Sequence, residues 1–311
     1  MTDPRADSAT ESVAVVIVTY NRADLLMNML EGLANQTRLA DAVYVVDNGS
    51  TDHTAAVLRE RLDLPLHLIN PGENLGGAGG FHLGLRTAHQ AGHDRFLLMD
   101  DDVVPAADFL AVMGAHPGPC QMAVREDPQG NLFEKAAIRF NLDNPFAIRP
   151  KTAAVDEVYP TRADMPAEVP VEAVAFEGFM VRREVVDAIG FPDPAYFIFY
   201  DDVDYALRAR RAGFEIVCLR DAVLVRQLDF NQQHDLAGWK GFYMYRNLFV
   251  VHFRYGANAA VRFKPWVIVL AVILLSPLRG GRREAANVIR AVWSARRMRS
   301  LPETNHPAST L

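Results

Sequence analysis

Three consecutive carboxylates, Asp100, Asp101 and Asp102, follow an apolar run at residues 96–99. Such a run is typical of a buried parallel strand, and open α/β sheets bind ligands just beyond the carboxyl ends of their strands. Neighbouring carboxylates repel one another and raise each other's pKa, so folding alone gains nothing from three of them. A divalent cation that bridges to a phosphate would offset this repulsion. A solvated acidic turn at the start of a helix is the alternative, and it explains one Asp more readily than three.

A second acidic group, Asp201, Asp202 and Asp204, follows the aromatic stretch at residues 196–200. Acidic residues are favourable in the first turn of a helix, so helix capping is a sufficient explanation for some of them. Asp201 and Asp202 are adjacent, and two adjacent carboxylates raise the pKa of at least one. From the pattern alone, a role beyond helix capping stays open.

The elements around these acids alternate between strand and helix from residue 13 to about residue 116. Apolar, β-branched runs at 13–20, 42–46 and 66–70 predict strands, and apolar residues at helical spacing follow the first of them. The turn residues at 47–52 predict a helix that begins near Thr51. This alternation predicts an α/β fold with a doubly wound, mostly parallel, Rossmann-like sheet.

The second half of the chain is less regular. Prolines interrupt residues 117–170, which predicts short strands, turns and a mobile loop. Further on, the pattern predicts a helix at 183–189 that ends at Gly190, and another that begins at the second acidic group and continues through Arg211.

Glycines crowd residues 76–80. They follow the third strand and lack the G-x-G-x-x-G spacing after the first, so they indicate a dinucleotide site only weakly. Their plainer meaning is a close approach of the backbone, either to a ligand phosphate or to a neighbouring element. Both readings stay open from the sequence.

Composition bounds the remaining possibilities. The 311 residues are 50% hydrophobic and carry a net charge of −6, so nothing indicates a nucleic-acid partner. Cys120 and Cys218 do not make a disulfide framework, which favours a reducing compartment. Residues 1–12 are polar, lack the apolar core of a secretion signal and are expected to form a disordered tail.

The C-terminal end differs from the rest of the chain. Residues 265–278 are almost wholly apolar but shorter than the ~20 residues of a membrane span. Seven arginines follow: Arg279, Arg282, Arg283, Arg290, Arg296, Arg297 and Arg299. An apolar stretch beside a basic amphipathic helix predicts association with a membrane surface. A core helix with a solvated basic flank is the alternative.

Taken together, the motifs resemble those of family 2 glycosyltransferases, which are inverting enzymes of the GT-A fold. They occur in the family's order, at residues 18–22, 46–52, 74–77, 99–102 and 200–205. Within the family, residues 74–81, 99–102 and 245–247 are most similar to bacterial cell-wall galactofuranosyltransferases, and rhamnosyltransferases share much of the pattern. The resemblance implies a GT-A domain at 13–255, with a nucleotide-binding half at 13–116 and an acceptor and catalytic half at 117–255. Residues 256–311 would form a helical, apolar and basic extension.

The resemblance also implies residue roles. Asp202 matches the general base, with Asp201 beside it, and Asp100 and Asp102 match acids that hold Mn²⁺ or Mg²⁺. The nucleotide-sugar donor would be bound by Thr19, Arg22, Asp47, Asn74, Gly77, Asp100 and Asp101.

Two positions depart from the family pattern. Arg226 stands where relatives commonly have a metal-binding His, and Tyr200 stands where galactofuranosyltransferases often have Trp. His234 lies in the following loop and could replace the missing ligand. We expect Tyr200, Arg226 and His234 to contact substrate or phosphate.

The implied function is transfer of galactofuranose from UDP-galactofuranose to a lipid-linked cell-envelope glycan. The enzyme would be cytoplasmic and peripheral on the inner face of the cell membrane, and an oligomer is compatible with the sequence. The alternatives are a rhamnosyltransferase that uses dTDP-rhamnose and a catalytically silent nucleotide-binding module. An NAD-dependent oxidoreductase is disfavoured by the position of the glycines and by the acid triplet.

Overall fold

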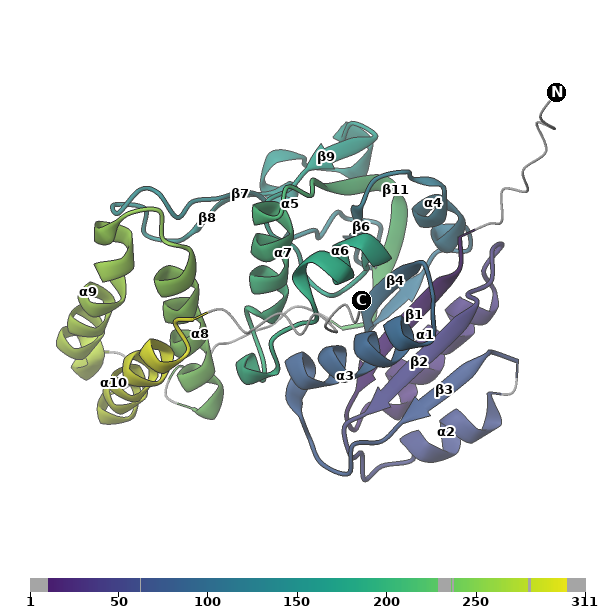
Figure 1. The fold of residues 1–311 in the computed structure, drawn as a ribbon, viewed down its shortest axis with the longest axis horizontal. Coiled ribbons are helices and arrows are strands. Elements are labelled where there is room, and N and C mark those ends of the chain that lie inside the picture. The colour runs from purple at the N-terminus through teal and green to yellow at the C-terminus, as the bar shows by residue number, and fades with distance from the viewer. Residues whose placement is uncertain (1–10, 62, 229–235, 237, 279–280, 301–311) are drawn as a thin grey trace, which may run out of the picture.

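The computed structural model describes residues 11–61, 63–228, 236, 238–278 and 281–300. These residues form a large twisted sheet with helices on its faces and a helical C-terminal region beside it (Figure 1). The main sheet has the strand order β3-β2-β1-β4-β10-β6-β11-β5, and β9 pairs with β11. The fold is therefore α/β, as predicted.

The first half of the sheet is parallel. Its strands are β1 (Val13–Thr19), β2 (Ala42–Asp47), β3 (Leu66–Ile69) and β4 (Arg95–Asp100). Helices α1 (Ala23–Ala34), α2 (Thr54–Glu60) and α3 (Gly76–Gln90) connect them. Parallel pairing of β1 with β2 and β4 brings the carboxyl ends of these strands to one edge. Helix α2 begins at Thr54 and not near Thr51, because the Asp52 carboxylate binds Thr54 and the backbone N–H of Ala23 and so holds the preceding loop.

The second half of the sheet is mixed. Its strands are β5 (Val103–Pro105), β6 (Cys120–Glu126), β9 (Glu168–Pro170), β10 (Phe179–Arg182) and β11 (Ile216–Arg226). Strand β10 runs antiparallel between β4 and β6, which places the residues that precede it beside the carboxyl end of β4. Helices α4 (Phe109–Ala115), α5 (Val155–Val158), α6 (Arg183–Ile189) and α7 (Asp201–Arg211) accompany these strands.

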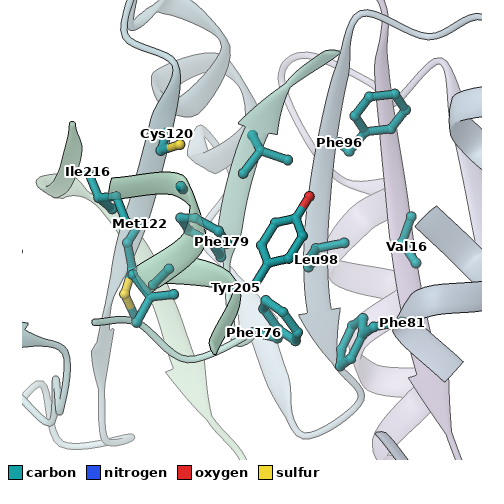
Figure 2. Close-up of a cluster of buried hydrophobic side chains, with 14 of the residues drawn as sticks. Val16, Phe81, Phe96, Leu98, Cys120, Met122, Phe176, Phe179, Tyr205 and Ile216 are labelled. Atoms are coloured by element: carbon teal, nitrogen blue, oxygen red, sulfur yellow. The ribbon is translucent and has the colours of Figure 1, made fainter. Parts of the chain in front are cut away.

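Alternate residues of the central strands point to opposite faces of the sheet and form two cores. On one face Phe96, Leu98 and Phe179 pack beneath α3 and α7, and Figure 2 shows Phe81 and Tyr205 closing over them. On the other face the next residues along, Leu97 and Met99 among them, pack against α1 and α4. Cys120 and Cys218 are buried and free, as expected for a chain without a disulfide framework.

The C-terminal region consists of α8 (Trp239–Tyr255), α9 (Ala259–Leu275) and α10 (Gly281–Arg297). Helices α9 and α10 pack on α8 through a third core, which includes Val250, Val272 and Val292. A hairpin of β7 (Ala137–Phe140) and β8 (Lys151–Ala154) reaches toward this region (Figure 1). Within the described ranges, no helix combines the length and apolarity needed to cross a membrane.

Candidate active site

Asp101 anchors the first acidic group to the end of β1. Thr19 Oγ1 donates to Asp101 Oδ2 at 2.7 Å, and Arg22 Nη1 donates to Asp101 Oδ1 at 2.9 Å. Arg22 also reaches Asp102 Oδ2 at 3.1 Å, and its guanidinium remains about half exposed. Thr19 and Asp101 are both buried, and the hydrogen bond between them satisfies the Thr19 hydroxyl donor and one Asp101 oxygen. The structure thus brings these four predicted residues together, with Arg22 at the boundary to solvent.

Asp100 and Asp102 are left with excess negative charge. Burial raises the pKa of Asp100 well above its usual range, and the charges of Asp102 and Glu177 raise it further. Burial and Glu177 likewise raise the pKa of Asp102, against the opposing charges of Arg22 and Arg226. Asp102 Oδ1 is buried and accepts no hydrogen bond from any described residue. A cation beside this oxygen would lower both pKa values.

The two carboxylates fit a metal site that the substrate completes. In the described part of the chain, no group of three or more His, Cys, Asp or Glu side chains could hold a metal ion. Mg²⁺ commonly uses only one or two protein carboxylates and takes its other ligands from substrate phosphates and water. Asp100 and the unpartnered oxygen of Asp102 match that limited ligand set.

Glu177 is a further carboxylate at this edge, and no role was predicted for it from the sequence. It directly precedes Gly178 and β10, so antiparallel pairing of β10 with β4 sets it beside Asp100. Arg125 Nη1 lies 2.5 Å from Glu177 Oε2, while Arg125 Nε and Nη2 donate to the two oxygens of Glu134 at 2.9 and 3.0 Å. Burial favours a higher pKa for Glu177, but Arg125 outweighs burial and the pKa is lowered. Glu177 therefore stays ionised and projects negative charge into the site.

Arg226 ends β11 next to this group. It pairs with Val103 across the β11–β5 ladder, one residue beyond Asp102, and its guanidinium lies 4.9 Å from the centre of the Phe133 ring. Its charge lowers the pKa of both Asp102 and Glu177. The residue that replaces the family's His thus supplies positive charge to the acids that flank the predicted metal site. His234 lies outside the described residues.

The glycine run is explained largely by its neighbours. A Cβ on Gly76 would lie 2.1 Å from the Phe197 carbonyl oxygen, and one on Gly80 or Gly84 would meet Val18 or Val16 at 2.5 Å. Gly76 also has a φ of +70°, a conformation that favours glycine. Gly77 differs, because a Cβ there would meet nothing within 4 Å. Close contacts with Phe197, Leu75 and Val18 thus account for Gly76, Gly79 and Gly80, and Gly77 faces open space at the helix start.

Asp47 and Asn74 occupy the other side of this edge. Asp47 is paired in register with Thr19 at the ends of β2 and β1, and its Oδ1 accepts from the Ser50 N–H at 2.9 Å. Asn74 is exposed, and its Oδ1 accepts from the Gly76 N–H at 2.8 Å at the start of α3. The structure therefore places Asp47 at the carboxyl end of β2 and Asn74 at the start of α3, two residues before Gly76.

The second acidic group opens α7 after a strained loop. Phe197, Phe199 and Tyr200 have φ values of 63°, 67° and 65°, which bulky side chains rarely adopt. Burial, followed by the charge of Asp202, raises the pKa of Asp201 well above its usual range. The pKa of Asp202 is raised to about 6, mainly by burial and further by Glu177, while Lys151 opposes the shift. Glu177 thus links the two acidic groups electrostatically.

Two residues of α8 hold this loop from behind. Asn247 Nδ2 donates to the carbonyl oxygens of Tyr196, Ile198 and Phe199 at 3.0, 2.7 and 2.8 Å. Arg246 Nη2 donates to the carbonyls of Ala195 and Tyr196, both at 2.7 Å, and Arg246 Nε donates to Asn247 Oδ1 at 2.8 Å. We call Arg246 and Asn247 the α8 clamp.

Asp204 belongs to a separate buried network. Its carboxylate accepts from the hydroxyls of Tyr196 and Tyr255 at 2.9 and 2.6 Å, and from Arg208 and Arg254 at 3.0 Å each. All its oxygen atoms are committed to structure, unlike those of Asp202. The network ties α7 to α8 behind the site.

A family model described as "Glycosyltransferase like family 2" matches residues 10–240. The chain belongs to this family. It is therefore a glycosyltransferase, and the NAD-dependent oxidoreductase considered from the glycines is excluded.

Within the family, this glycosyltransferase is similar to two galactofuranosyltransferases. Galactofuranosyltransferase GlfT1 of Mycobacterium tuberculosis (strain ATCC 25618 / H37Rv) is 33% identical over 219 residues, 69% of this chain and 70% of the relative. Galactofuranosyltransferase GlfT2 of Mycolicibacterium smegmatis (strain ATCC 700084 / mc(2)155) is 28% identical over 271 residues, 77% of this chain and 40% of the relative.

Solved structures support the GT-A fold of this glycosyltransferase. Mannosyltransferase PcManGT from Pyrobaculum calidifontis, solved with GDP-Man and Mn²⁺, aligns over 95% of this chain and 78% of its own with a TM-score of 0.55 and 21% identity. GalNAc-T7, solved with UDP, GalNAc and Mn²⁺, aligns over 95% of this chain and 59% of its own with a TM-score of 0.60 and 12% identity. At these identities the likeness concerns the fold.

Sequence reasoning missed Glu177, Arg125 and Lys151. The available signal was a charge next to apolar residues, since Arg125 follows the apolar residues at 122–124 and Glu177 interrupts the apolar stretch at 173–181. A charge in such a run is costly to bury unless it is paired, so each predicts a partner. Nothing local identifies which partner.

Proposed function

We propose that this glycosyltransferase transfers galactofuranose from UDP-galactofuranose to a lipid-linked glycan of the cell envelope, with inversion at the anomeric carbon. The observation that carries the proposal is that two acidic groups with different pKa shifts lie near the same edge of the sheet. Asp100 and Asp102 have raised pKa values and an unpartnered oxygen, and Asp202 has a pKa of about 6. The choice of sugar rests on the galactofuranosyltransferase relatives.

In this proposal Asp202 is the general base. A pKa of about 6 leaves it mostly ionised at neutral pH while still basic enough to accept a proton from the acceptor hydroxyl. The hydroxyl oxygen then bonds to the anomeric carbon, and the bond to the nucleotide diphosphate breaks on the opposite face. Asp201, whose pKa lies well above its usual range, is the less suitable base.

The donor would lie along the edge from Asp47 and Asn74 to Asp102. Gly77 leaves room beside the start of α3, and the half-exposed Arg22 provides a planar fork of donors suited to phosphate oxygens. Asp100 and Asp102 would hold Mn²⁺ or Mg²⁺, which supplies positive charge opposite the diphosphate when bound. Arg226 adds fixed positive charge next to Asp102, and Tyr200 would contact the sugars.

The acceptor would be reached at a membrane surface. We propose that the C-terminal region holds the enzyme peripherally on the inner, cytoplasmic face of the cell membrane. Exposed apolar residues on α9 and exposed arginines on α10 support this location.

The test is transfer with purified protein, a lipid-linked acceptor and either UDP-galactofuranose or dTDP-rhamnose. We expect product only with the UDP donor, inverted anomeric configuration by NMR, loss of activity in EDTA and recovery with Mn²⁺ or Mg²⁺. If transfer occurred only from dTDP-rhamnose, the transferred sugar would be rhamnose and the proposal of galactofuranose would be wrong. Donor binding by thermal shift without transfer or hydrolysis would favour the silent module, and full activity in EDTA would remove the metal from the proposal.

A further inference from the structure

The loop between β7 and β8 exposes two large apolar side chains. Phe146 is 88% exposed and Ile148 is 91% exposed. The loop is nevertheless ordered by its own hydrogen bonds, because Asn141 Oδ1 accepts from the Asn144 N–H and Asn144 Oδ1 accepts from the Phe146 N–H, both at 2.9 Å. An ordered loop that holds apolar side chains in water is typical of a surface that another phase or molecule covers.

This loop is fastened to the first turns of α9. Asn258 Nδ2 donates to the Asp143 carbonyl at 2.7 Å, and the Ala257 N–H donates to the Leu142 carbonyl at 2.8 Å. The ammonium group of Lys264 donates to the carbonyl of Ala147. Figure 1 shows the hairpin lying against this end of the helical region. The loop and α9 therefore present one surface.

Helix α9 continues the exposed apolar character. Phe263, Val267, Leu270 and Leu274 recur at helical spacing, and each is more than half exposed. The opposite side of α9, with Val261, Pro265 and Val272, is buried against the protein. Trp266 packs edge-on against the half-exposed Trp293 of α10, with ring centres 5.6 Å apart. We call Phe146, Ile148, Phe263, Val267, Leu270 and Leu274 the apolar face.

The exposed charge around the apolar face is mostly positive, and Asp143 of the β7–β8 loop is an exposed acid there. Arg149 and Arg262 are exposed beside it, and α10 adds Arg282, Arg283, Arg290, Arg296 and Arg297. Helix α9 contains no Asp or Glu, and Glu284, the single acid of α10, is buried. An apolar surface with a mostly cationic rim complements an anionic lipid bilayer better than it complements a second copy of this chain.

We propose that the apolar face is a docking surface for an anionic lipid bilayer, into which the β7–β8 loop inserts beside α9. This extends the proposed membrane association, which assigned contact only to the C-terminal region. The start of the same loop borders the second acidic group, since Phe140 and Leu142 belong to a buried cluster against which Tyr200 and Val203 pack, the residues on either side of Asp201 and Asp202. Docking by this face would thus hold Asp202 next to the bilayer, where a lipid-linked acceptor hydroxyl lies.

Substitution tests this better than truncation, because α10 covers α8 with Val288 and Val292, and deleting it would expose that core. The test variant is Phe146→Ser with Ile148→Ser in the full chain. Its matched control is Leu39→Ser with Leu68→Ser, two exposed apolar residues in the nucleotide-binding half, 60% and 52% exposed. Binding is measured by sedimentation with vesicles of phosphatidylcholine, alone or mixed with phosphatidylglycerol, and thermal unfolding reports the fold of each variant.

We expect the unmodified protein to bind the anionic vesicles more tightly than the neutral ones, and salt to weaken that binding. The loop variant should bind the anionic vesicles about tenfold more weakly, and the control should match the unmodified protein. Equal binding by loop variant and unmodified protein would overturn the proposal. So would equal binding to both vesicles, or a dimer in solution that the loop substitutions dissociate.

The sedimentation assay contains no sugar donor or glycan acceptor, so its outcome is independent of the proposed transfer reaction. A transfer assay with a short, water-soluble acceptor separates the two further. The loop variant should use that acceptor at the rate of the unmodified protein, because neither Phe146 nor Ile148 belongs to the active site. If neither protein transferred sugar to this acceptor, the proposed function would be contradicted, and the result of the sedimentation assay would be unaffected.

Discussion

The two acidic groups of this glycosyltransferase are built in different ways. Asp100, Asp101 and Asp102 follow a central strand, and their main partners, Thr19 and Arg22, end the neighbouring parallel strand or follow it. Asp202 follows a loop in which three aromatic residues have positive φ, and the α8 clamp holds that loop. Sheet topology alone positions the first group, whereas the second depends on a helix that is remote in sequence. Changes far from the chemistry should therefore affect the proposed base more than the acids proposed to bind the metal.

The largest expected effect is loss of the base itself. Asp202→Asn keeps the size of the side chain but removes the proton acceptor, so transfer should fall by about 10²–10⁴-fold. Donor binding, measured by thermal shift, should stay close to that of the unmodified protein. Asp108→Asn, an exposed acid before α4, is the control and should be fully active. Transfer by the Asp202 variant at the normal rate would end its assignment as base.

The next effect tests the α8 clamp. Asn247→Ala removes three hydrogen bonds from this loop. The Tyr196 carbonyl keeps its bond from Arg246, whereas the partly buried carbonyls of Ile198 and Phe199 lose the Asn247 donor, at a cost of up to about 1–3 kcal/mol for each group left unsatisfied. A loop with positive φ at three bulky residues relaxes when that support is lost, since each such residue costs roughly 1–3 kcal/mol. We expect kcat to fall by about tenfold or more, with donor KM little changed and a lower melting temperature.

The comparison variant for the clamp lies in the first acidic group. Thr19→Val removes one hydrogen bond to Asp101 but leaves the bond from Arg22 in place. Its loss of stability should be about 1 kcal/mol, close to the net contribution of one hydrogen bond. If Thr19→Val lowered kcat as much as Asn247→Ala, the proposed difference between the two groups would be wrong.

Glu177 offers a pH test of the link between the groups. Its negative charge raises the pKa of Asp202, so Glu177→Gln should lower that pKa. The base acts when ionised, so kcat/KM of the unmodified enzyme should rise with pH through about 6. In the variant this rise should occur at lower pH, which increases activity at pH 5 relative to pH 8. An unchanged pH profile would show that Glu177 does not face Asp202 in the working enzyme.

The smallest effect concerns the departure at Arg226. Arg226→His exchanges a permanent charge beside Asp102 for a residue that can coordinate a metal. We expect the Mn²⁺ concentration for half-maximal activity to decrease a few-fold. This result requires the imidazole to lie close to Asp102, and the effect of the Arg226 charge on the pKa of Asp102 supports that placement. Arg220→His, on the same strand but paired with the exposed Asp221, is the control and should leave the metal requirement unchanged.

The sequence predicted those features that depend on local pattern. The helix at 183–189, its end at Gly190 with a φ of +72°, and the helix end at Arg211 all follow from periodicity and capping. The parallel half of the sheet follows from strand and helix alternation. The carboxyl ends of adjacent parallel strands then bring Thr19, Asp47 and Asp100 together.

What the sequence could not provide were pairings across long separations. Strand β10 joins the centre of the sheet antiparallel, and this alone places Glu177 beside Asp100. The resemblance identified residues 245–247 as a motif but gave no contact for them, and the structure shows Arg246 and Asn247 binding a loop 48–51 residues earlier. Positive φ at Phe197, Phe199 and Tyr200 contradicts the preference of these residues, so no local rule predicts it.

The Asp204 network bears on how this enzyme could be recombined with its relatives. Tyr255 and Arg254, at the end of α8, contact Asp204 on α7, so α8 is inseparable from the loop that presents the base. A chimera joined at Gly256 would retain those contacts and exchange only α9 and α10. The graft would have to carry an acid at the position of Glu284, because Tyr245 donates its hydroxyl to that carboxylate at 2.6 Å. The part of the proposed apolar face that lies on α9 could then be exchanged between family members while the catalytic loop keeps its own support.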